Sequence, residues 1–125
     1  MSADIIFKEE SYKIIGACFA VHRKLGPGFL ESVYSEALEI ELIQNDIPFE
    51  KEKKLQLRYD DTILKKYFKV DFICYNVILL ELKSAKFLSE TDVRQVLNYL
   101  KATKIRLALL INFGSKSLTY KRILN

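Results

Sequence analysis

The sequence predicts an α/β fold, with a sheet flanked by helices. Three observations indicate it: apolar residues recur at helical spacing before residue 45, they alternate through residues 54–84, and a helix-capping motif precedes two further strand patterns. Glycine and proline are few, at 4 and 2 of 125 residues, and half of the chain is hydrophobic, which is enough for one core. We therefore expect a single domain that covers residues 1–125.

Two helices are expected first. In residues 5–25 the apolar positions with a helical period are Ile14, Ile15, Cys18, Val21 and Leu25. Gly26-Pro27-Gly28 ends this pattern, and a second helix is expected over residues 29–44. Its inward side chains would be Leu30, Val33, Ala37, Leu38 and Leu42.

The strands follow, and a third helix separates them. They are expected at residues 54–59, 63–74, 77–84, 106–111 and 117–123. Asp60-Asp61 is a turn between the first two strands, and Gly114 lies between the last two. Ser89-Glu90-Thr91-Asp92 has the pattern of a capping box, which predicts a helix that ends near residue 102.

Three ionisable residues interrupt the apolar pattern of the second and third strands. The residues expected on one apolar face of this hairpin are Phe68, Val70, Phe72, Cys74, Ile78, Leu80 and Leu82. Asp71, Glu81 and Lys83 then point to the opposite face. Two carboxylates beside an ammonium group are typical of a site that holds a hard divalent cation such as Mg²⁺.

The register of the hairpin decides whether these carboxylates meet. A two-residue loop at Tyr75-Asn76 would place Asp71 opposite Leu80, on the wrong face from Glu81. A three-residue connection or a bulge would place Asp71 opposite Glu81, where a shared cation or proton would offset their repulsion. The alternative is that both carboxylates form ion pairs with neighbouring lysines on a solvated face.

These residues resemble a known family. Asp71, nine residues and then Glu81-Leu82-Lys83 are similar to the core signature of the PD-(D/E)XK nuclease superfamily, with Val70 in the place of its proline. Residues 28–34, Gly-Phe-Leu-Glu-Ser-Val-Tyr, reproduce the GxxExxY motif of a family of small proteins within that superfamily. Gln95 and Tyr99 resemble the Q-x₃-Y element of its recombination-type nucleases, and the resemblance covers about residues 14–123.

The resemblance implies a restriction-endonuclease-like core, with a mixed central sheet flanked by helices. It also implies metal-dependent hydrolysis of nucleic-acid phosphodiester bonds. Asp71, Glu81 and the Leu82 carbonyl would hold Mg²⁺ or Mn²⁺. Lys83 would position the attacking hydroxide and offset charge on the phosphate.

The same resemblance gives roles to residues on the helices. Glu31 would assist at the metal, and Gln95 with Tyr99 would orient the carboxylates or the substrate. His22 and Tyr34 are candidates for supporting contacts around the site. Each has a purely structural alternative: Glu31 and His22 could interact with helix dipoles, Tyr34 could pack in the core, and Gln95 with Tyr99 could be an exposed pair.

Positive charge is concentrated late in the chain. Residues 84–125 hold two acidic side chains and eight basic ones, which are Lys86, Arg94, Lys101, Lys104, Arg106, Lys116, Lys121 and Arg122. This segment carries about +6 and residues 1–83 about −2. Such asymmetry suits a phosphate backbone beside metal ligands, and we expect Lys101 and Lys104 to contact nucleic acid, DNA more than RNA. The alternative is a solvated surface.

Other features bear on location and partners. Charged residues near the amino terminus exclude a signal core, no apolar run is long enough for a membrane span, and a cytoplasmic protein is expected. Cys18 and Cys74 lack metal-binding spacing and should be reduced core thiols.

Substrate selection would come from a homodimer or a protein partner. Two other functions stay open: an inactive nuclease-fold module that binds nucleic acid or acts in a complex, and a structural partner protein.

Overall fold

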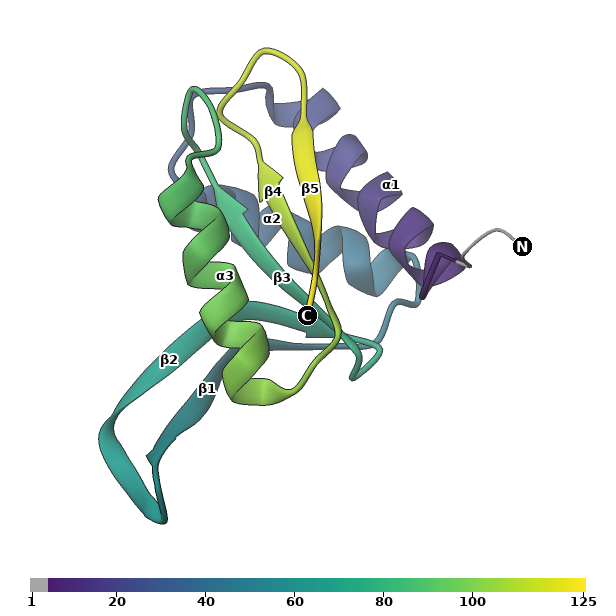
Figure 1. Cartoon of the computed structure of the whole chain (residues 1–125). Helices are drawn as coiled ribbons and strands as arrows, with labels where there is room; N and C mark the ends of the chain where they lie inside the picture. The colour runs from purple at the N-terminus through teal and green to yellow at the C-terminus, as the bar shows by residue number, and fades with distance from the viewer. Residues whose placement is uncertain (1–4) are drawn as a thin grey trace.

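The structure is a computed structural model that describes residues 5–125 (Figure 1). Its elements are α1 (Lys8–Leu25), α2 (Glu31–Gln44), β1 (Phe49–Tyr59), β2 (Thr62–Cys74), β3 (Ile78–Lys83), α3 (Glu90–Thr103), β4 (Leu107–Asn112) and β5 (Thr119–Leu124). The strands form one sheet of order β1-β2-β3-β4-β5. Because β3 and β4 are parallel and the other neighbours antiparallel, the sheet is mixed. The expected α/β fold is confirmed.

The helices cover both faces of the sheet (Figure 1). Helices α1 and α2 pack on one face, over a core that includes Ile14, Val21, Leu38, Leu80 and Leu109. Helix α3 makes the crossover that parallel strands require, from β3 to β4, and packs on the other face. That smaller core includes Ile73, Leu79, Val96, Leu100 and Leu110.

The helix termini follow the expected signals. The Gly26 N–H donates to the His22 carbonyl at 2.7 Å and ends α1. Gly26 and Gly28 have φ values of 69° and 106°, which side chains disfavour, so the loop into α2 needs its glycines. The capping box of α3 is confirmed, because Ser89 Oγ accepts from the Asp92 N–H and Asp92 Oδ2 accepts from the Ser89 N–H.

Strand β1 begins at Phe49, five residues before the expected start at residue 54. The charged residues 50–54 hid it, since they do not alternate with apolar ones. These charges are compatible with a strand at this position because β1 is an edge of the sheet, where charged side chains meet solvent. Beyond the sheet body, β1 and β2 continue as a paired two-stranded extension (Figure 1).

Strand β2 departs from the expected single apolar face. Phe72 packs under α1 and α2, whereas Phe68 and Val70 pack on the α3 side. The change occurs at Asp71, which lies opposite Glu52 in the register of β1 and β2. Glu52 has a φ of 53°, a left-handed conformation that interrupts the extended backbone of β1 there. The alternation expected from sequence is therefore correct only on either side of Asp71.

A buried amide and a glycine fix the chain after β3. Asn112 is fully buried, and its Oδ1 accepts from the N–H groups of Ala85 and Gly114, both at 3.0 Å. Its Nδ2 donates to the Ala85 carbonyl at 2.9 Å. A Cβ on Gly114 would lie 2.2 Å from the Ala85 nitrogen, so only glycine fits. The β4–β5 loop thus holds the segment that follows Lys83.

The two cysteines lie in the core. Cys18 and Cys74 are buried free thiols, and burial raises the pKa of both, that of Cys74 to about 12. Neither therefore has the character of a reactive thiolate. Among the described residues, no helix combines the length and the apolar character that a membrane span requires.

Candidate active site

The β2–β3 hairpin has a three-residue connection. Asn76 within it takes a left-handed conformation, with a φ of 61°. Phe72 pairs with Leu80, so the same register places Asp71 opposite Glu81. Of the two registers that the sequence left open, the structure has the one that brings these carboxylates together.

The backbone pairing of β2 and β3 ends at Phe72 and Leu80, and beyond it the carboxylates of Asp71 and Glu81 bond to backbone N–H groups of the facing strand. Asp71 Oδ2 accepts a hydrogen bond from the Leu82 N–H at 2.7 Å. Glu81 Oε1 accepts one from the Asp71 N–H at 3.0 Å. Since the N–H and C=O of a strand residue point to the same side, the Leu82 carbonyl is directed to the Asp71 side of β3. The second oxygen of each carboxylate makes no hydrogen bond within residues 5–125.

Burial and nearby negative charges raise the pKa of both carboxyls. Glu81 is buried, with 6% of the residue exposed. This burial, and next the negative charge of Asp71, raises the pKa of Glu81 to about 8. Burial also raises the pKa of Asp71, with further contributions from the negative charges of Glu31 and Glu52. The charge of Lys83 opposes both shifts. A site of this kind favours a proton or a cation between its carboxylates.

Lys83 ends β3 beside this pair and reaches toward α3. Its Nζ lies 3.8 Å from Asp92 Oδ1, and both side chains are about a quarter exposed, at 24% and 22%. Hydrogen bonds from Ser89 lower the pKa of Asp92, and the charge of Lys83 lowers it further. Sequence reasoning treated Asp92 only as a capping residue and missed this contact, which becomes visible only when α3 is placed next to β3.

Helix α3 presents Asp92, Gln95 and Tyr99 on one side, because spacings of three and four residues share a helix face. Tyr99 is 6% exposed and its ring centroid lies 4.5 Å from that of Phe68. Burial, followed by the charges of Glu81 and Asp71, raises the pKa of Tyr99 to about 12. Gln95 is exposed. On this side of the helix it lies between Asp92, which is close to Lys83, and Tyr99, whose pKa is raised by the charge of Glu81.

Glu31 approaches Asp71 from α2, on the side away from α3. It begins the helix, is exposed, and lines a hollow of about 520 Å³ together with Asp71 and Leu82. The hollow is strongly acidic, since Glu36, Glu39 and Glu52 line it too and Lys51 is its one basic side chain. Glu52 was missed from sequence, because it lies in a lysine-rich segment and only the β1–β2 register brings it opposite Asp71.

Tyr34 does not contact the carboxylates, contrary to one expectation for it. Its hydroxyl donates to the Gly26 carbonyl at 2.5 Å and accepts from the Phe29 N–H at 3.2 Å. Its buried ring stacks on Phe113, with centroids 4.6 Å apart. Tyr34 therefore shapes the loop that leads into Glu31, which is the core-packing alternative with a satisfied hydroxyl.

His22 is also a structural contact rather than a neighbour of the carboxylates. Its Nε2 lies 3.0 Å from the Ser115 carbonyl, in the β4–β5 loop. A separate bond joins the loop before Glu31 to the end of β3, since Ser84 Oγ donates to the Phe29 carbonyl at 2.6 Å. These contacts place the GxxExxY segment next to the strand that carries Glu81 and Lys83.

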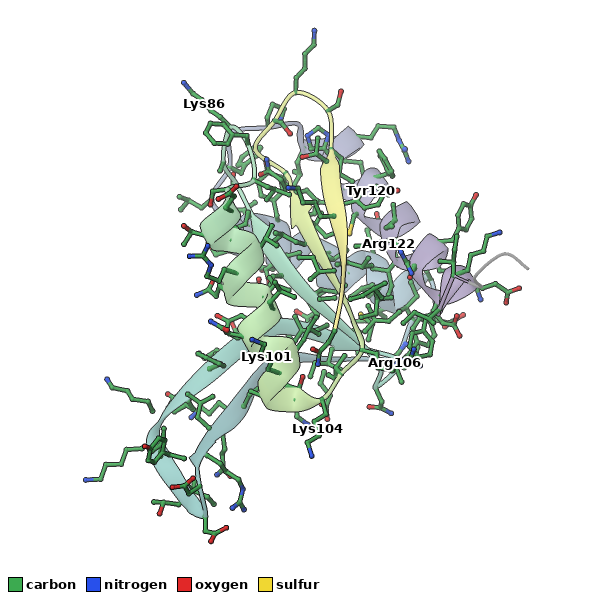
Figure 2. The ribbon with its side chains drawn as sticks, viewed as in Figure 1. Lys86, Lys101, Lys104, Arg106, Tyr120 and Arg122 are labelled. Atoms are coloured by element: carbon green, nitrogen blue, oxygen red, sulfur yellow. The ribbon has the colours of Figure 1, made fainter. Side chains whose placement is uncertain are left out.

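The basic residues of the last third do not form one patch. Lys101 and Lys104 are exposed near the carboxyl end of α3, and Lys86 lies at the opposite end of the molecule (Figure 2). Arg122 has a structural role, because its guanidinium donates to Ser11 Oγ and to the Ile6 carbonyl, both at 2.9 Å. The charge asymmetry seen in the sequence is thus distributed over several surfaces.

Comparison with known proteins identifies the family. A family model described as the PD-(D/E)XK nuclease superfamily matches residues 8–123. The chain belongs to this superfamily. Its fold is also similar to the crystal structure of SSO0001, with a TM-score of 0.61 and 17% sequence identity. That match covers 95% of this chain and 57% of SSO0001, so the chain spans little more than half of that protein. No curated protein matches the sequence.

PD-(D/E)XK proteins typically use a divalent metal, and the donors present here suit one. Within residues 5–125, no group of three or more His, Cys, Asp or Glu side chains is arranged to hold a metal ion. Asp71, Glu81 and the Leu82 carbonyl nevertheless offer oxygen donors, and the raised pKa values of the two carboxyls favour a cation or a proton beside them. Mg²⁺ is commonly held by one or two carboxylates and keeps waters or phosphate oxygens as its other ligands. The residues therefore fit Mg²⁺ or Mn²⁺.

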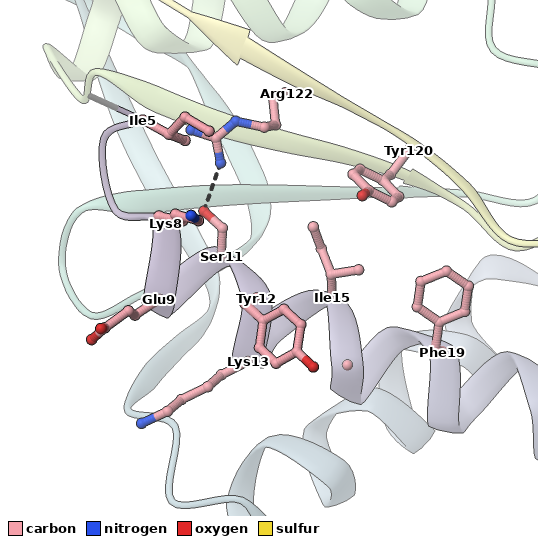
Figure 3. A pocket seen from close by; sticks show the side chains of 11 residues that line it. Ile5, Lys8, Glu9, Ser11, Tyr12, Lys13, Ile15, Phe19, Tyr120 and Arg122 are labelled. Atoms are coloured by element: carbon pink, nitrogen blue, oxygen red, sulfur yellow. Dashed lines mark hydrogen bonds between the residues drawn. The ribbon is translucent and has the colours of Figure 1, made fainter. Parts of the chain in front are cut away.

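A different hollow lies between α1 and β5 and is separate from the candidate site (Figure 3). Its volume is about 720 Å³, and Ile15, Phe19 and Tyr120 contribute an apolar lining. Arg122 crosses one end, where it bonds to Ser11. None of the candidate site residues lines this hollow, so its size does not bear on the proposed chemistry.

Proposed function

We propose that this chain is a nuclease of the GxxExxY type within the PD-(D/E)XK superfamily. It would hydrolyse phosphodiester bonds of nucleic acid, DNA in preference to RNA, with Mg²⁺ or Mn²⁺. One observation carries the proposal: Asp71 and Glu81 face each other where β2 and β3 separate, and Lys83 follows two residues after Glu81. Carboxylates and a lysine at this position of this fold suit phosphodiester hydrolysis.

The protein groups have distinct roles in this proposal. Asp71, Glu81 and the Leu82 carbonyl would hold the metal. When bound, the metal would lower the pKa of a coordinated water and stabilise negative charge on the phosphate. Lys83 would place its ammonium beside the phosphate as charge develops. Its 3.8 Å separation from Asp92 is longer than a hydrogen bond, so the side chain can turn from Asp92 to a substrate oxygen.

Residues from the two flanking helices would complete the site. Glu31, which lines the hollow beside Asp71, would hold a water of the metal or the metal itself. Gln95 is exposed and would meet the substrate, whereas buried Tyr99 would act on the position and charge of Glu81. Lys101 and Lys104 would add phosphate contacts farther along α3. We further propose that a homodimer or a protein partner supplies target selection.

A cleavage assay tests the proposal. Purified protein is incubated with labelled duplex DNA, single-stranded DNA and RNA across titrations of Mg²⁺ and Mn²⁺. Wild type should cleave DNA only with metal, and Lys83→Ala should lower the rate by at least about a hundredfold because one charge-stabilising donor is lost. Lys86→Ala is the matched control, since this exposed lysine lies outside the site.

The same assay separates the nuclease from the alternative. Lys83→Ala should keep its fold, because a partly exposed ion pair contributes about 1 kcal/mol or less to the free energy of unfolding. If wild type binds nucleic acid but shows only the trace cleavage of Lys83→Ala at every metal concentration, the enzyme proposal is wrong. The nuclease-fold binding module then replaces it.

A further inference from the structure

The outer parts of β1 and β2 form a projecting two-stranded ribbon, residues 53–69, which extends away from the sheet body (Figure 1). Every residue from 58 to 67 is exposed. Only the base of the ribbon is anchored, where Leu55 and Phe68 pack in the core on the α3 side. Because both faces of its outer end are exposed to solvent and do not pack on the sheet body, the ribbon is available to a partner.

The ribbon is a basic segment of the molecule. It contains two acidic residues, Asp60 and Asp61, and six basic ones, which are Lys53, Lys54, Arg58, Lys65, Lys66 and Lys69. Its net charge of about +4 equals that of the whole chain, so the remaining residues sum to about zero. Within residues 5–125 the one ion pair of these six is between Lys53 and Glu50, at 2.7 Å.

One face of the ribbon leads directly to the carboxylates. Side chains alternate along a strand, and Phe68 and Val70 pack on the α3 side, so Tyr67 and Lys69 point to the opposite face of β2. Asp71 reaches that same side, since it lines the hollow next to α2. Lys54 lies opposite Lys69, and its Nζ is 5.0 Å from the centre of the Tyr67 ring. Two residues along a strand span about 7 Å. A phosphate bound at Lys69 would therefore lie about 7 Å along the strand from Asp71.

The dimensions and charge of the ribbon favour duplex DNA. The major groove of B-form DNA is about 12 Å wide and admits a two-stranded ribbon, whereas the corresponding groove of duplex RNA is too narrow. A single strand would need one cationic face. Lys53 and Lys54 are adjacent and exposed, so they point to opposite faces, and Arg58, Lys65 and Lys66 surround the end. Cationic side chains on both faces match the two phosphate walls of a groove.

We propose that the ribbon of residues 53–69 inserts into the groove of duplex DNA and directs the DNA backbone to Asp71 and Glu81. This inference deepens the proposed nuclease function and rests on it for the meaning of the site. It identifies duplex DNA as the substrate class. In this proposal the main phosphate contacts are made by the ribbon and not by Lys101 and Lys104.

Binding in EDTA, where no metal-dependent cleavage occurs, tests the ribbon separately. Fluorescence anisotropy would measure labelled duplex DNA, single-stranded DNA and duplex RNA of one sequence, over a range of salt. The ribbon variant is Lys65→Ala/Lys66→Ala/Lys69→Ala. The control is Lys13→Ala/Lys116→Ala/Lys121→Ala, which removes three exposed lysines remote from the ribbon in sequence.

The ribbon variant should bind duplex DNA about tenfold or more weakly at 0.1 M salt, with a salt slope smaller by roughly 3. The control variant should bind as wild type does. A Lys→Arg version of the ribbon variant should restore affinity, and circular dichroism should show that all variants are folded. These results would support the inference.

Three results would overturn it. The ribbon variant could bind duplex DNA like the control variant, or wild type could prefer single-stranded DNA or duplex RNA. The third is a wild-type dimer that the ribbon variant converts to monomer without losing DNA affinity, which would make the ribbon a contact between copies. Normal binding by the ribbon variant with lost cleavage in Lys83→Ala refutes the ribbon alone. Weak binding by the ribbon variant with no wild-type cleavage refutes the nuclease function alone.

Discussion

Asp71 and Glu81 face each other across β2 and β3, and each carboxylate is tied to backbone at the point where the ladder stops. Asp71 Oδ2 accepts from the Leu82 N–H, and Glu81 Oε1 accepts from the N–H of Asp71 itself. The groups that separate the strands are thus the same groups that would hold a metal. Among residues 5–125, the second oxygen of each carboxylate has no hydrogen-bond partner, so these bonds orient the carboxylates and leave one oxygen of each available to a metal.

Asp71→Asn should remove Mn²⁺ affinity and cleavage together. The amide oxygen of asparagine can still accept from the Leu82 N–H, so the separation of the strands is kept while the charge is lost. Isothermal titration with Mn²⁺ and a thermal melt would measure the two properties. Asp61→Asn, in the exposed turn of the ribbon, is the matched control. Wild-type Mn²⁺ affinity in Asp71→Asn would contradict the assignment of this ligand.

The pH dependence of stability should reveal Glu81. Its pKa of about 8 lies above the ordinary value of 4.5, so between these values the folded protein holds a proton that the unfolded chain has lost. The contribution of this carboxyl to the free energy of unfolding is therefore present below about pH 4.5 and lost as pH rises through about 8. Glu81→Gln, which does not titrate, should gain stability relative to wild type as pH rises.

Urea unfolding in EDTA at pH 5, 6.5 and 8 would test this, with wild type and Glu81→Gln compared at each pH. A constant difference across that range would show that Glu81 titrates normally. Metal ligands must be deprotonated, so added Mn²⁺ should raise the melting temperature of wild type more at pH 8 than at pH 6. The same addition should leave Asp71→Asn unchanged.

The sequence was sufficient for the fold class and the order of elements, because the helical and alternating patterns there are long. It could not choose between two hairpin registers, since Asn76 suits both a two-residue turn and the three-residue connection that forms. The change of face at Asp71 was also hidden. It lies opposite the left-handed conformation of Glu52, a residue type that does not indicate such a conformation in a strand.

The surroundings of the site were predicted less completely than its centre. Asp71, Glu81 and Lys83 lie close together in sequence, so a motif could reveal them. Asp92 and Glu52 join them only through tertiary structure. Tyr34 shows the opposite case, in which a motif position contributes packing and loop geometry rather than a contact with the carboxylates.

Tyr34→Phe should destabilise the protein by about 1–3 kcal/mol, because it leaves the Gly26 carbonyl and the Phe29 N–H without their partner. Chemical denaturation would measure the loss. Tyr12→Phe is the control, since that side chain is 80% exposed and should change stability by less than about 0.5 kcal/mol. Equal effects of the two substitutions would show that the Tyr34 hydroxyl does not hold the loop.

Two Gly→Ala substitutions should act with opposite sign. At Gly114 an added Cβ would lie 2.2 Å from the Ala85 nitrogen and 2.3 Å from its oxygen, and these backbone atoms can yield only by moving the segment after β3. We expect Gly114→Ala to lower the free energy of unfolding by about 2–3 kcal/mol or more. Gly16 lies within α1, and a Cβ added there would meet open space among residues 5–125. Gly16→Ala should therefore raise the free energy of unfolding by about 0.5–1 kcal/mol.

The Gly114 substitution should also affect the proposed chemistry. The Phe113 N–H donates to the Lys83 carbonyl at 2.8 Å, so movement of the β4–β5 loop is transmitted to the residue that would meet the phosphate. Cleavage measured well below the melting temperature of the variant should fall more than the folded fraction does, while Gly16→Ala keeps wild-type activity. If the loss of cleavage instead equals the unfolded fraction, Gly114 supports the fold without positioning Lys83, and the close packing after β3 has no separate part in the site.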